Sequence, residues 1–262
     1  MVPYIPVIRP YKKRLDWRET CHAYNRDLLS VWRRSYALSV CKDKITGGWN
    51  SGNYGGCVNI GSGGTFILES GSITGNKIEN SSGDAKGGAF FVGVRATLTM
   101  SGGSITNNSA SAGKSAYGGA VCVYYYGTGN GTFNMNGGTI TGNSVSGSDA
   151  KGGGVYVGNN EGIYEMNVSG IVTVTGNTAN SAANNVDISS GTVIKITGNL
   201  DDATRIGITA TADQTVTKDL KNYGTLGNFT SDNEASGYVL ERLYAGADIC
   251  DNGTCKRGYR FR

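Results

Sequence analysis

The sequence predicts an all-β protein, a right-handed single-stranded parallel β-helix with three strands in each coil of about 32–35 residues. Three short elements recur in step along the chain, and each alternates apolar and polar residues with a period of two. Composition agrees, because 42 of the 262 residues are glycine and all three prolines lie in the first ten positions. Such a chain can use nearly all of its backbone N–H groups in strand ladders.

The first recurring element is a glycine pair followed by a short strand. It reads GGCVNI at 55–60, GGAFFV at 87–92, GGAVCV at 118–123 and GGGVYV at 152–157, and NNVDI at 184–188 is a degraded fifth copy. The apolar residues at alternate positions predict strands with one side in the core. The glycines predict tight corners that require a positive φ.

Two further strands complete each unit. One reads TFIL at 65–68, TLTM at 97–100, TFNM at 132–135 and YEM at 164–166. The other reads SGSITGN at 70–76, GGSITNN at 102–108, GGTITGN at 137–143 and GIVTVTGN at 170–177. Stacking the units brings like residues into columns with a spacing of about 4.8 Å. This pattern predicts a long, thin apolar core that is built coil by coil.

An asparagine follows each strand of the SIT type. These residues form a column of their own: Asn76, Asn108, Asn143 and Asn177. Stacked amides can bond to one another and to the turn backbone. Metal or ligand coordination is the alternative, but no Asp or Glu column accompanies the asparagines. We therefore predict a structural asparagine ladder.

The units resemble those of a known repeat family. SITGNKIENSSGDAKGGAFFV, SITNNSASAGKSAYGGAVCV and TITGNSVSGSDAKGGGVYV are similar to the GGA-I and F-x-x-N repeats of chlamydial polymorphic outer-membrane proteins. They are also similar to β-helix repeats in adhesin-like surface proteins of gut bacteria. The resemblance covers roughly residues 45–200, and segment 203–241 is similar to the end of such arrays. It implies surface display and adhesion, although Ile or Val replaces the family's Phe before x-x-N.

The two ends of the chain differ from the repeats. Residues 1–44 carry ten Lys or Arg against four acidic residues, and the run 15–40 predicts an amphipathic helix that covers the first coil. A basic surface for nucleic acid or anionic lipid and a non-native start are the alternatives. The chain thus divides into the 1–44 cap, the 45–200 repeats, and irregular final coils with a C-terminal cap over 201–262.

The cysteines leave the redox state open. Cys250 and Cys255 flank a DNGT turn, which predicts either a small hairpin disulfide or two free thiols. A lone CxxxxC is no zinc site. Among the others, Cys57 and Cys122 stand in different registers of their units and should not pair, whereas Cys21 and Cys41 could meet only if their segment folds back.

The sequence offers little for catalysis. Its only histidine, His22, lies in the expected cap, so Ser-His-Asp or Cys-His chemistry on the coils is excluded. We expect no catalytic residue, no metal site and no cofactor.

Two acidic patterns keep an enzyme as the alternative. Equivalent GDAKGG and SDAKGG segments pair Asp84 with Lys86 and Asp149 with Lys151, which suits a polysaccharide lyase but is more typical of a repeated solvated turn. Glu161 and Glu165 offer a glycosidase pair.

Outward positions are the best candidates for binding. The alternation places aromatic residues on the outside of neighbouring strands and predicts an exposed platform for sugars or a partner protein: Phe91, Tyr124, Tyr126 and Tyr156. Stacking that only stabilises adjacent strands is the alternative. A second outward pattern of Ser or Thr on both sides of the SIT isoleucine resembles the Thr-x-Thr arrays of ice-binding β-helices, although Thr also favours strands in general.

These observations favour a non-enzymatic, adhesin-like surface or secreted protein that binds glycan or a host or bacterial surface protein. A carbohydrate-active lyase, hydrolase or phage depolymerase on the same scaffold is the alternative. We expect no nucleic-acid partner and no transmembrane segment. The resemblance implies an extracellular or cell-surface location, although no signal peptide is visible near Met1.

Overall fold

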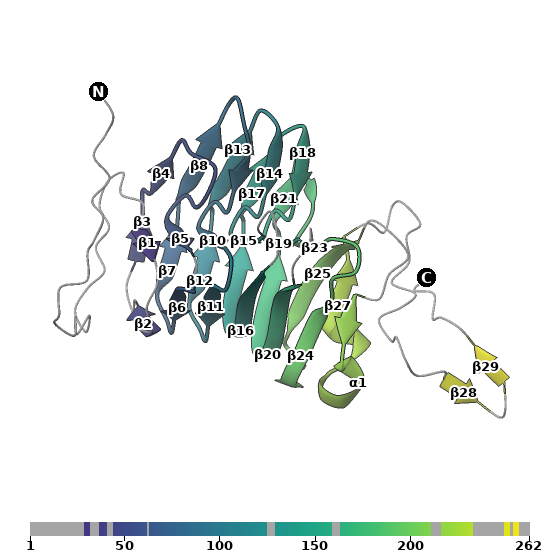
Figure 1. Cartoon of the computed structure of the whole chain (residues 1–262). Coiled ribbons are helices and arrows are strands. Elements are labelled where there is room, and N and C mark those ends of the chain that lie inside the picture. The colour runs from purple at the N-terminus through teal and green to yellow at the C-terminus, as the bar shows by residue number, and fades with distance from the viewer. Residues whose placement is uncertain are drawn as a thin grey trace, which may run out of the picture.

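The computed structural model confirms a parallel β-solenoid of about five turns (Figure 1). It describes residues 29–31, 37–40, 44–61, 63–124, 129–158, 163–210, 216–232, 249–251 and 254–256. Strands of successive coils pair in parallel and in register, so each coil hydrogen-bonds to the coils before and after it. The columns of like residues in the sequence are therefore ladders in space.

The strands of successive coils form three faces. The first face contains β1 (Leu29–Val31), β5 (Val58–Ile60), β10 (Phe90–Val92), β15 (Val121–Val123), β19 (Val155–Val157), β23 (Val186–Ile188), β25 (Arg205–Ala210) and β27 (Phe229–Ser231). The second contains β2 (Ala37–Val40), β6 (Thr65–Leu68), β11 (Thr97–Met100), β16 (Asn130–Thr141), β20 (Ile163–Thr175), β24 (Ile194–Leu200) and β26 (Thr217–Lys218). The third contains β3 (Lys44–Thr46), β7 (Ser72–Thr74) and β12 (Ser104–Thr106), and it continues through the second halves of β16 and β20.

The inward residues of the three faces form one continuous apolar core. The predicted positions are fully buried, as in the column Phe66, Leu98, Phe133 and Met166 and in the column Ile73, Ile105, Ile140 and Val174. Period-two alternation predicted these residues because only one side of each strand reaches the interior.

The glycine pairs form the corners before the first face, as predicted. Gly118 has a φ of 67°, in the left-handed region that side chains disfavour. Gly119 follows it, and a Cβ there would lie 2.2 Å from the carbonyl oxygen of Gly153 in the next coil. The first glycine is therefore required for the turn, and the second for the close approach of two backbones.

The asparagine ladder is confirmed, and it is longer than predicted. Each buried asparagine donates its backbone N–H and its Nδ2 to the Oδ1 of the next, over 2.8–3.0 Å, in the order Asn76, Asn108, Asn143, Asn177 and Asn185. Asn185 then donates both groups to the carboxylate of Asp232, at 2.6 and 2.7 Å. The ladder therefore ends on a residue that only accepts hydrogen bonds.

Five successive coils also carry one or two short strands that were not predicted. They form two sheets that project from one side of the solenoid (Figure 1), which we call the flange. One sheet contains β4 (Trp49–Asn50), β8 (Lys77–Asn80), β13 (Ser109–Ala112), β17 (Ser144–Ser146), β21 (Thr178–Ala179) and β22 (Ala182–Ala183). The other contains β9 (Ala85–Lys86), β14 (Ser115–Tyr117) and β18 (Asp149–Lys151). A small second core of mainly alanine, with Ile78 and Val145, lies between them.

The expected helix over 15–40 is wrong where the structure describes that segment. Leu29–Val31 and Ala37–Val40 are strands β1 and β2, which pair in parallel with β5 and β6. The edge of a solenoid coil offers a full row of backbone partners, and this pairing outweighs the helical spacing of the apolar residues. Residues 1–28 and 32–36 lie outside the described residues.

The C-terminal part carries little helix. It contains α1 (Leu220–Tyr223) and the 3-10 turn Leu226–Asn228, and farther along the chain β28 (Ile249–Asp251) pairs antiparallel with β29 (Thr254–Lys256). Within the described segments, no helix has the length and apolar character needed to span a membrane.

Candidate functional site

A cluster of aromatic and charged side chains fills the corner between the flange and the first face. Four of its residues form one register column across sheet β9–β14–β18, in which tyrosine and lysine alternate: Tyr54, Lys86, Tyr117 and Lys151. The facing residues come from the outer side of the first face and the residue after β15: Phe91, Cys122, Tyr124, Tyr156 and Asp187. We call these nine residues the corner cluster.

The expectation of an exposed aromatic platform is wrong for the described rings. Phe91 and Tyr156 do lie on the outer side of their strands, and Tyr124 follows β15. The three residues Phe91, Tyr124 and Tyr156 are nevertheless only 4%, 7% and 6% exposed. The flange covers them, because Tyr54 packs on Phe91 with ring centroids 4.4 Å apart and Tyr117 stacks on Tyr156 at 4.5 Å. Tyr126 lies outside the described residues.

Lys86 is the most deeply buried charged side chain of the corner cluster. Only 1% of its side chain is exposed, and its Nζ lies 2.6 Å from Asp84 Oδ2. The same ammonium lies 5.6–5.8 Å from the ring centroids of Tyr54, Tyr117 and Tyr124, which is cation–π range. Lys86 is thus not in a solvated turn, as the sequence suggested; it is a paired cation inside an aromatic cage.

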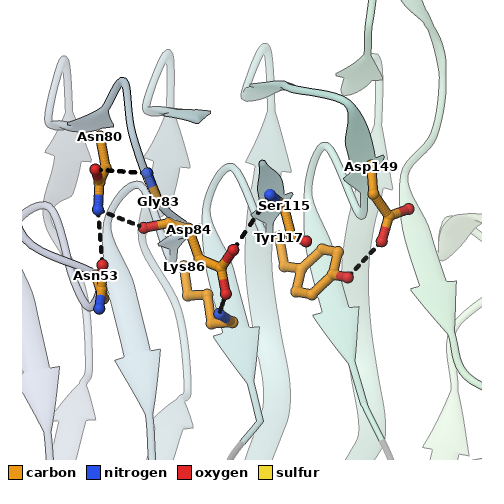
Figure 2. Close-up of polar contacts among 8 residues, drawn as sticks. All are labelled: Asn53, Asn80, Gly83, Asp84, Lys86, Ser115, Tyr117 and Asp149. Atoms are coloured by element: carbon orange, nitrogen blue, oxygen red, sulfur yellow. Dashed lines mark hydrogen bonds and ion pairs between the residues drawn. The ribbon is translucent and has the colours of Figure 1, made fainter. Parts of the chain in front are cut away.

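The aspartates of the same segments organise the flange. Figure 2 shows that Asp84 connects two coils. It binds Lys86 of its own coil and accepts a hydrogen bond from the backbone N–H of Ser115, in the next coil, at 3.3 Å. Its backbone oxygen accepts from Asn80 Nδ2 at 3.1 Å, and Asn80 in turn donates to Asn53 at 2.7 Å. These bonds connect three successive coils.

Asp149 pairs with Lys151 as Asp84 pairs with Lys86, but its other partner, Tyr117, belongs to the preceding coil. It accepts a hydrogen bond from the Tyr117 hydroxyl and lies 3.0 Å from Lys151 Nζ (Figure 2 shows the tyrosine contact). Burial by itself would raise the pKa of Asp149, but the hydrogen bonds from Tyr117 and Lys151 outweigh it and lower this pKa. Asp149 therefore stays ionised at neutral pH.

Asp187 takes the place of an aromatic residue at the next position of the first face. Its side chain is 2% exposed, and it pairs in register with Tyr156. Burial raises the pKa of Asp187 to about 6, and Asp149 and Asp232 add to this effect, whereas the hydrogen bond from Asn184 and the charge of Lys151 oppose it. The corner cluster thus holds two aspartates with opposite pKa shifts.

Cys57 and Cys122 do not form a disulfide with each other, as predicted. Both are buried, and Cys122 points outward from its strand into the corner cluster. Burial raises the pKa of Cys122, which keeps its thiol protonated. Cys250 and Cys255 are direct partners across the β28–β29 pair, so the hairpin is present, and the disulfide itself stays a prediction. Cys21 and Cys41 lie outside the described residues.

A second feature is a set of hydroxyl columns along the third face and the flange strands that follow it. They are in register over successive coils and comprise Ser72, Thr74, Ser104, Thr106, Ser109, Ser111, Thr139, Thr141, Ser144, Ser146, Thr173, Thr175 and Thr178. Thr106 donates to Thr74 at 3.2 Å, and Ser146 donates to Ser111 at 3.1 Å. All are at least partly exposed, so these columns form an accessible polar surface.

The other acidic candidates are not assembled into a pair. Glu165 lies on the second face and forms an ion pair with Lys195 of the next coil. Glu161 and His22 lie outside the described residues. Where side chains are described, no three of the His, Cys, Asp and Glu residues lie close enough together to hold a metal ion.

Sequence reasoning missed Tyr54, Tyr117 and Asp187 as members of the corner cluster. Tyr54 and Tyr117 precede the glycine pairs in segments that read as turns, and Asp187 belongs to the degraded fifth unit. One signal in the sequence did point to Tyr54 and Tyr117. Each stands directly before a GG pair, at the position that Lys86 and Lys151 occupy in the alternate coils.

The fold and the asparagine ladder define the class of protein, an all-β parallel solenoid with a buried asparagine ladder. No protein-family model, no curated protein and no solved structure matches the chain.

Proposed function

We propose that this protein is a non-enzymatic, adhesin-like β-helix of the cell surface or the extracellular medium, which binds glycan or protein along an exposed face. The repeats resemble those of surface-displayed bacterial β-helix proteins, and this resemblance supports the location and the class of function. The corner cluster is too well covered to act as an open platform, so the proposed binding face lies elsewhere on the coils.

The observation that carries the proposal is the set of hydroxyl columns. Successive coils repeat Ser or Thr at the same outward positions, as in Thr106, Thr141 and Thr175. A hydroxyl group both donates and accepts hydrogen bonds, which suits sugar hydroxyls and peptide groups alike. A ligand that lies across several coils makes many weak contacts at once, and their combined effect gives useful affinity.

The test is a glycan array, together with a panel of surface proteins, probed with the wild type and two matched variants. Thr141→Lys places a long cation in the middle of the hydroxyl columns, whereas Thr132→Lys places it on the second face of the same strand, β16. We expect the first variant to lose binding and the second to retain it. Equal binding by both variants, after a check that both fold, would refute the hydroxyl columns as the binding face.

The opposite pKa shifts of two aspartates in the corner cluster favour a carbohydrate-active enzyme as the second candidate. Glycosidases use one carboxylic acid and one carboxylate whose pKa values are pushed apart by their surroundings. Asp187 and Asp149 have this difference, because the pKa of Asp187 is raised to about 6 and that of Asp149 is lowered. The test is release of oligosaccharides from bound polysaccharides near pH 5, which Asp187→Asn and Asp149→Asn should each abolish if this candidate is correct.

A further inference from the structure

Trp49 differs from the tyrosines of the flange because it faces solvent. It is 39% exposed, and it lies on β4, at one end of sheet β4–β8–β13–β17–β21–β22 (Figure 1). Within the described part of the chain, only Ile171 and Tyr223 are comparably exposed among the large hydrophobic residues, and neither lies on the flange. A ring in this position contributes little to the core, and its surroundings indicate a different use.

A surface ion pair fixes the orientation of the Trp49 ring. Its Nε1–H donates to Glu79 Oε2 at 2.9 Å, and the other carboxylate oxygen of Glu79 lies 3.2 Å from Lys77 Nζ. The hydrogen bonds from Trp49 and Lys77 lower the pKa of Glu79, so this carboxylate is ionised at neutral pH. The ring is therefore held at its polar edge, and less conformational entropy is lost when a ligand packs against its face.

The outer side of this sheet continues from Trp49 as two columns of polar residues in register. The alternate residues point the other way, into the second core, as Ile78, Ala110 and Val145 do. The outward residues are all at least partly exposed, and we call them the flange strip: Trp49, Lys77, Glu79, Ser109, Ser111, Ser144, Ser146 and Thr178. From Trp49 to Thr178 the flange strip crosses successive strands about 4.8 Å apart, which gives a length of about 19 Å.

The flange strip has the groups that recognise a sugar chain. An aromatic ring packs on the apolar C–H face of a pyranose, and the hydroxyl groups that follow it both donate and accept hydrogen bonds. Its length suits an oligosaccharide that crosses several coils better than a single sugar. Its charges cancel, because Lys77 pairs with Glu79 and the other members are neutral, so it has no net charge with which to attract an acidic polymer.

We propose that the flange strip binds a neutral oligosaccharide, with one pyranose ring stacked on Trp49 and the following sugars on the serine and threonine hydroxyls. This inference rests on the proposed function and names its ligand class and its anchoring residue. A protein partner fits less well, since protein interfaces of standard size bury about 800 Å² on each partner around a core of apolar side chains. The flange strip has a single large apolar side chain, and the stacking of one sugar needs only one.

Isothermal titration calorimetry with the full chain tests this proposal. The probes are neutral oligomers of glucose, mannose, galactose and N-acetylglucosamine, from disaccharide to hexasaccharide, with oligogalacturonate as an acidic chain of similar size. We expect at least one neutral series to bind more tightly as its length grows, and oligogalacturonate not to bind.

Matched variants locate the site. Trp49→Ala should weaken binding of the neutral series about tenfold or more, and Trp49→Phe, which keeps a ring, should retain part of the affinity. Tyr223→Ala is the control, because Tyr223 is also 39% exposed but lies on α1, and this variant should bind like the wild type. Thermal melting checks that each variant folds.

The outcomes separate this proposal from the broader one. If Trp49→Ala binds like the wild type while Thr141→Lys loses binding, the flange strip is not the site and the proposed function stands. If the wild type binds only oligogalacturonate, or only proteins of the surface panel, the proposed ligand class is wrong. If it binds neither glycan nor protein, the proposed function fails as well. Loss of binding in Trp49→Ala, with Tyr223→Ala unchanged, supports the flange strip.

Discussion

At the residue scale, the ladder has a direction that follows from the chemistry of the amide. Each Oδ1 accepts two hydrogen bonds from the preceding asparagine, so each Nδ2 is free to donate to the next one and to carbonyls of its own and earlier coils. A final member must accept without donating, and the carboxylate of Asp232 meets this need. The sequence predicted the four periodic asparagines, but Asn185 and Asp232 fall outside the period, so spacing could not reveal them.

Asn143→Ala tests the strength of the ladder at its middle. The substitution removes the acceptor of the Asn108 backbone N–H and the amide that donates to the carbonyl of Ile105, both in a buried setting, and it takes one of three acceptors from Asn108 Nδ2. We expect the free energy of unfolding to fall by about 1–3 kcal/mol, the cost of unpaired buried polar groups. Urea denaturation measures this change. Asn134→Ala is the control, because Asn134 is only partly buried, and an equal loss in both variants would contradict the special role of the ladder.

Asp187→Asn tests the buried carboxyl group. The pKa of Asp187 is about 6 in the folded protein, above its ordinary value of 3.8, so the folded state holds the proton more tightly than the unfolded state. The stability that this group contributes is complete below about pH 4 and is lost as the pH rises through about 6. The variant should melt like the wild type at pH 4 and be more stable at pH 8, by up to about 3 kcal/mol. A variant that is less stable at pH 8 would show that the carboxylate is favourably paired.

At the element scale, the strands with one side in the core were predictable and the flange strands were not. Leu98 and Met100 alternate with Thr97 and Thr99, and this apolar–polar contrast carries the signal. The flange strand Ser109–Ala112 alternates only serine and alanine, whose contrast in hydropathy is small, and only its alanines lie in the minor core. The same omission explains the error about the aromatic rings, since only the flange covers the outer side of Phe91 and Tyr156.

Gly119→Ala tests the corner that joins the flange to the first face. The added Cβ would lie 2.2 Å from the carbonyl oxygen of Gly153, and backbone cannot move aside as a flexible side chain can. We expect a loss of about 2–4 kcal/mol in the free energy of unfolding. Gly227→Ala is the matched control, since the nearest atom to its Cβ is 3.6 Å away. A loss at Gly119 as small as at Gly227 would mean that successive coils separate at low cost.

At the scale of the whole molecule, stability is a sum over neighbouring coils. Strands pair with the preceding and the following coil, and the ladder and the Asp84 contacts cross the same boundaries. In such a one-dimensional array, an inner coil is held from two sides and the last one from a single side. Opening is therefore expected to begin at an end and to proceed coil by coil.

Amide hydrogen exchange measures this order directly. Among the described strands, we expect the amides of β15 and β16 in the middle coils to exchange slowest and those of β26 to exchange fastest. In the Asn143→Ala variant, the protection should fall in the coils on both sides of residue 143, because the lost amide connects them. Asn134→Ala should change exchange only locally. Equal protection in every strand, with an equal drop everywhere in the Asn143 variant, would instead show that the solenoid opens as one cooperative unit.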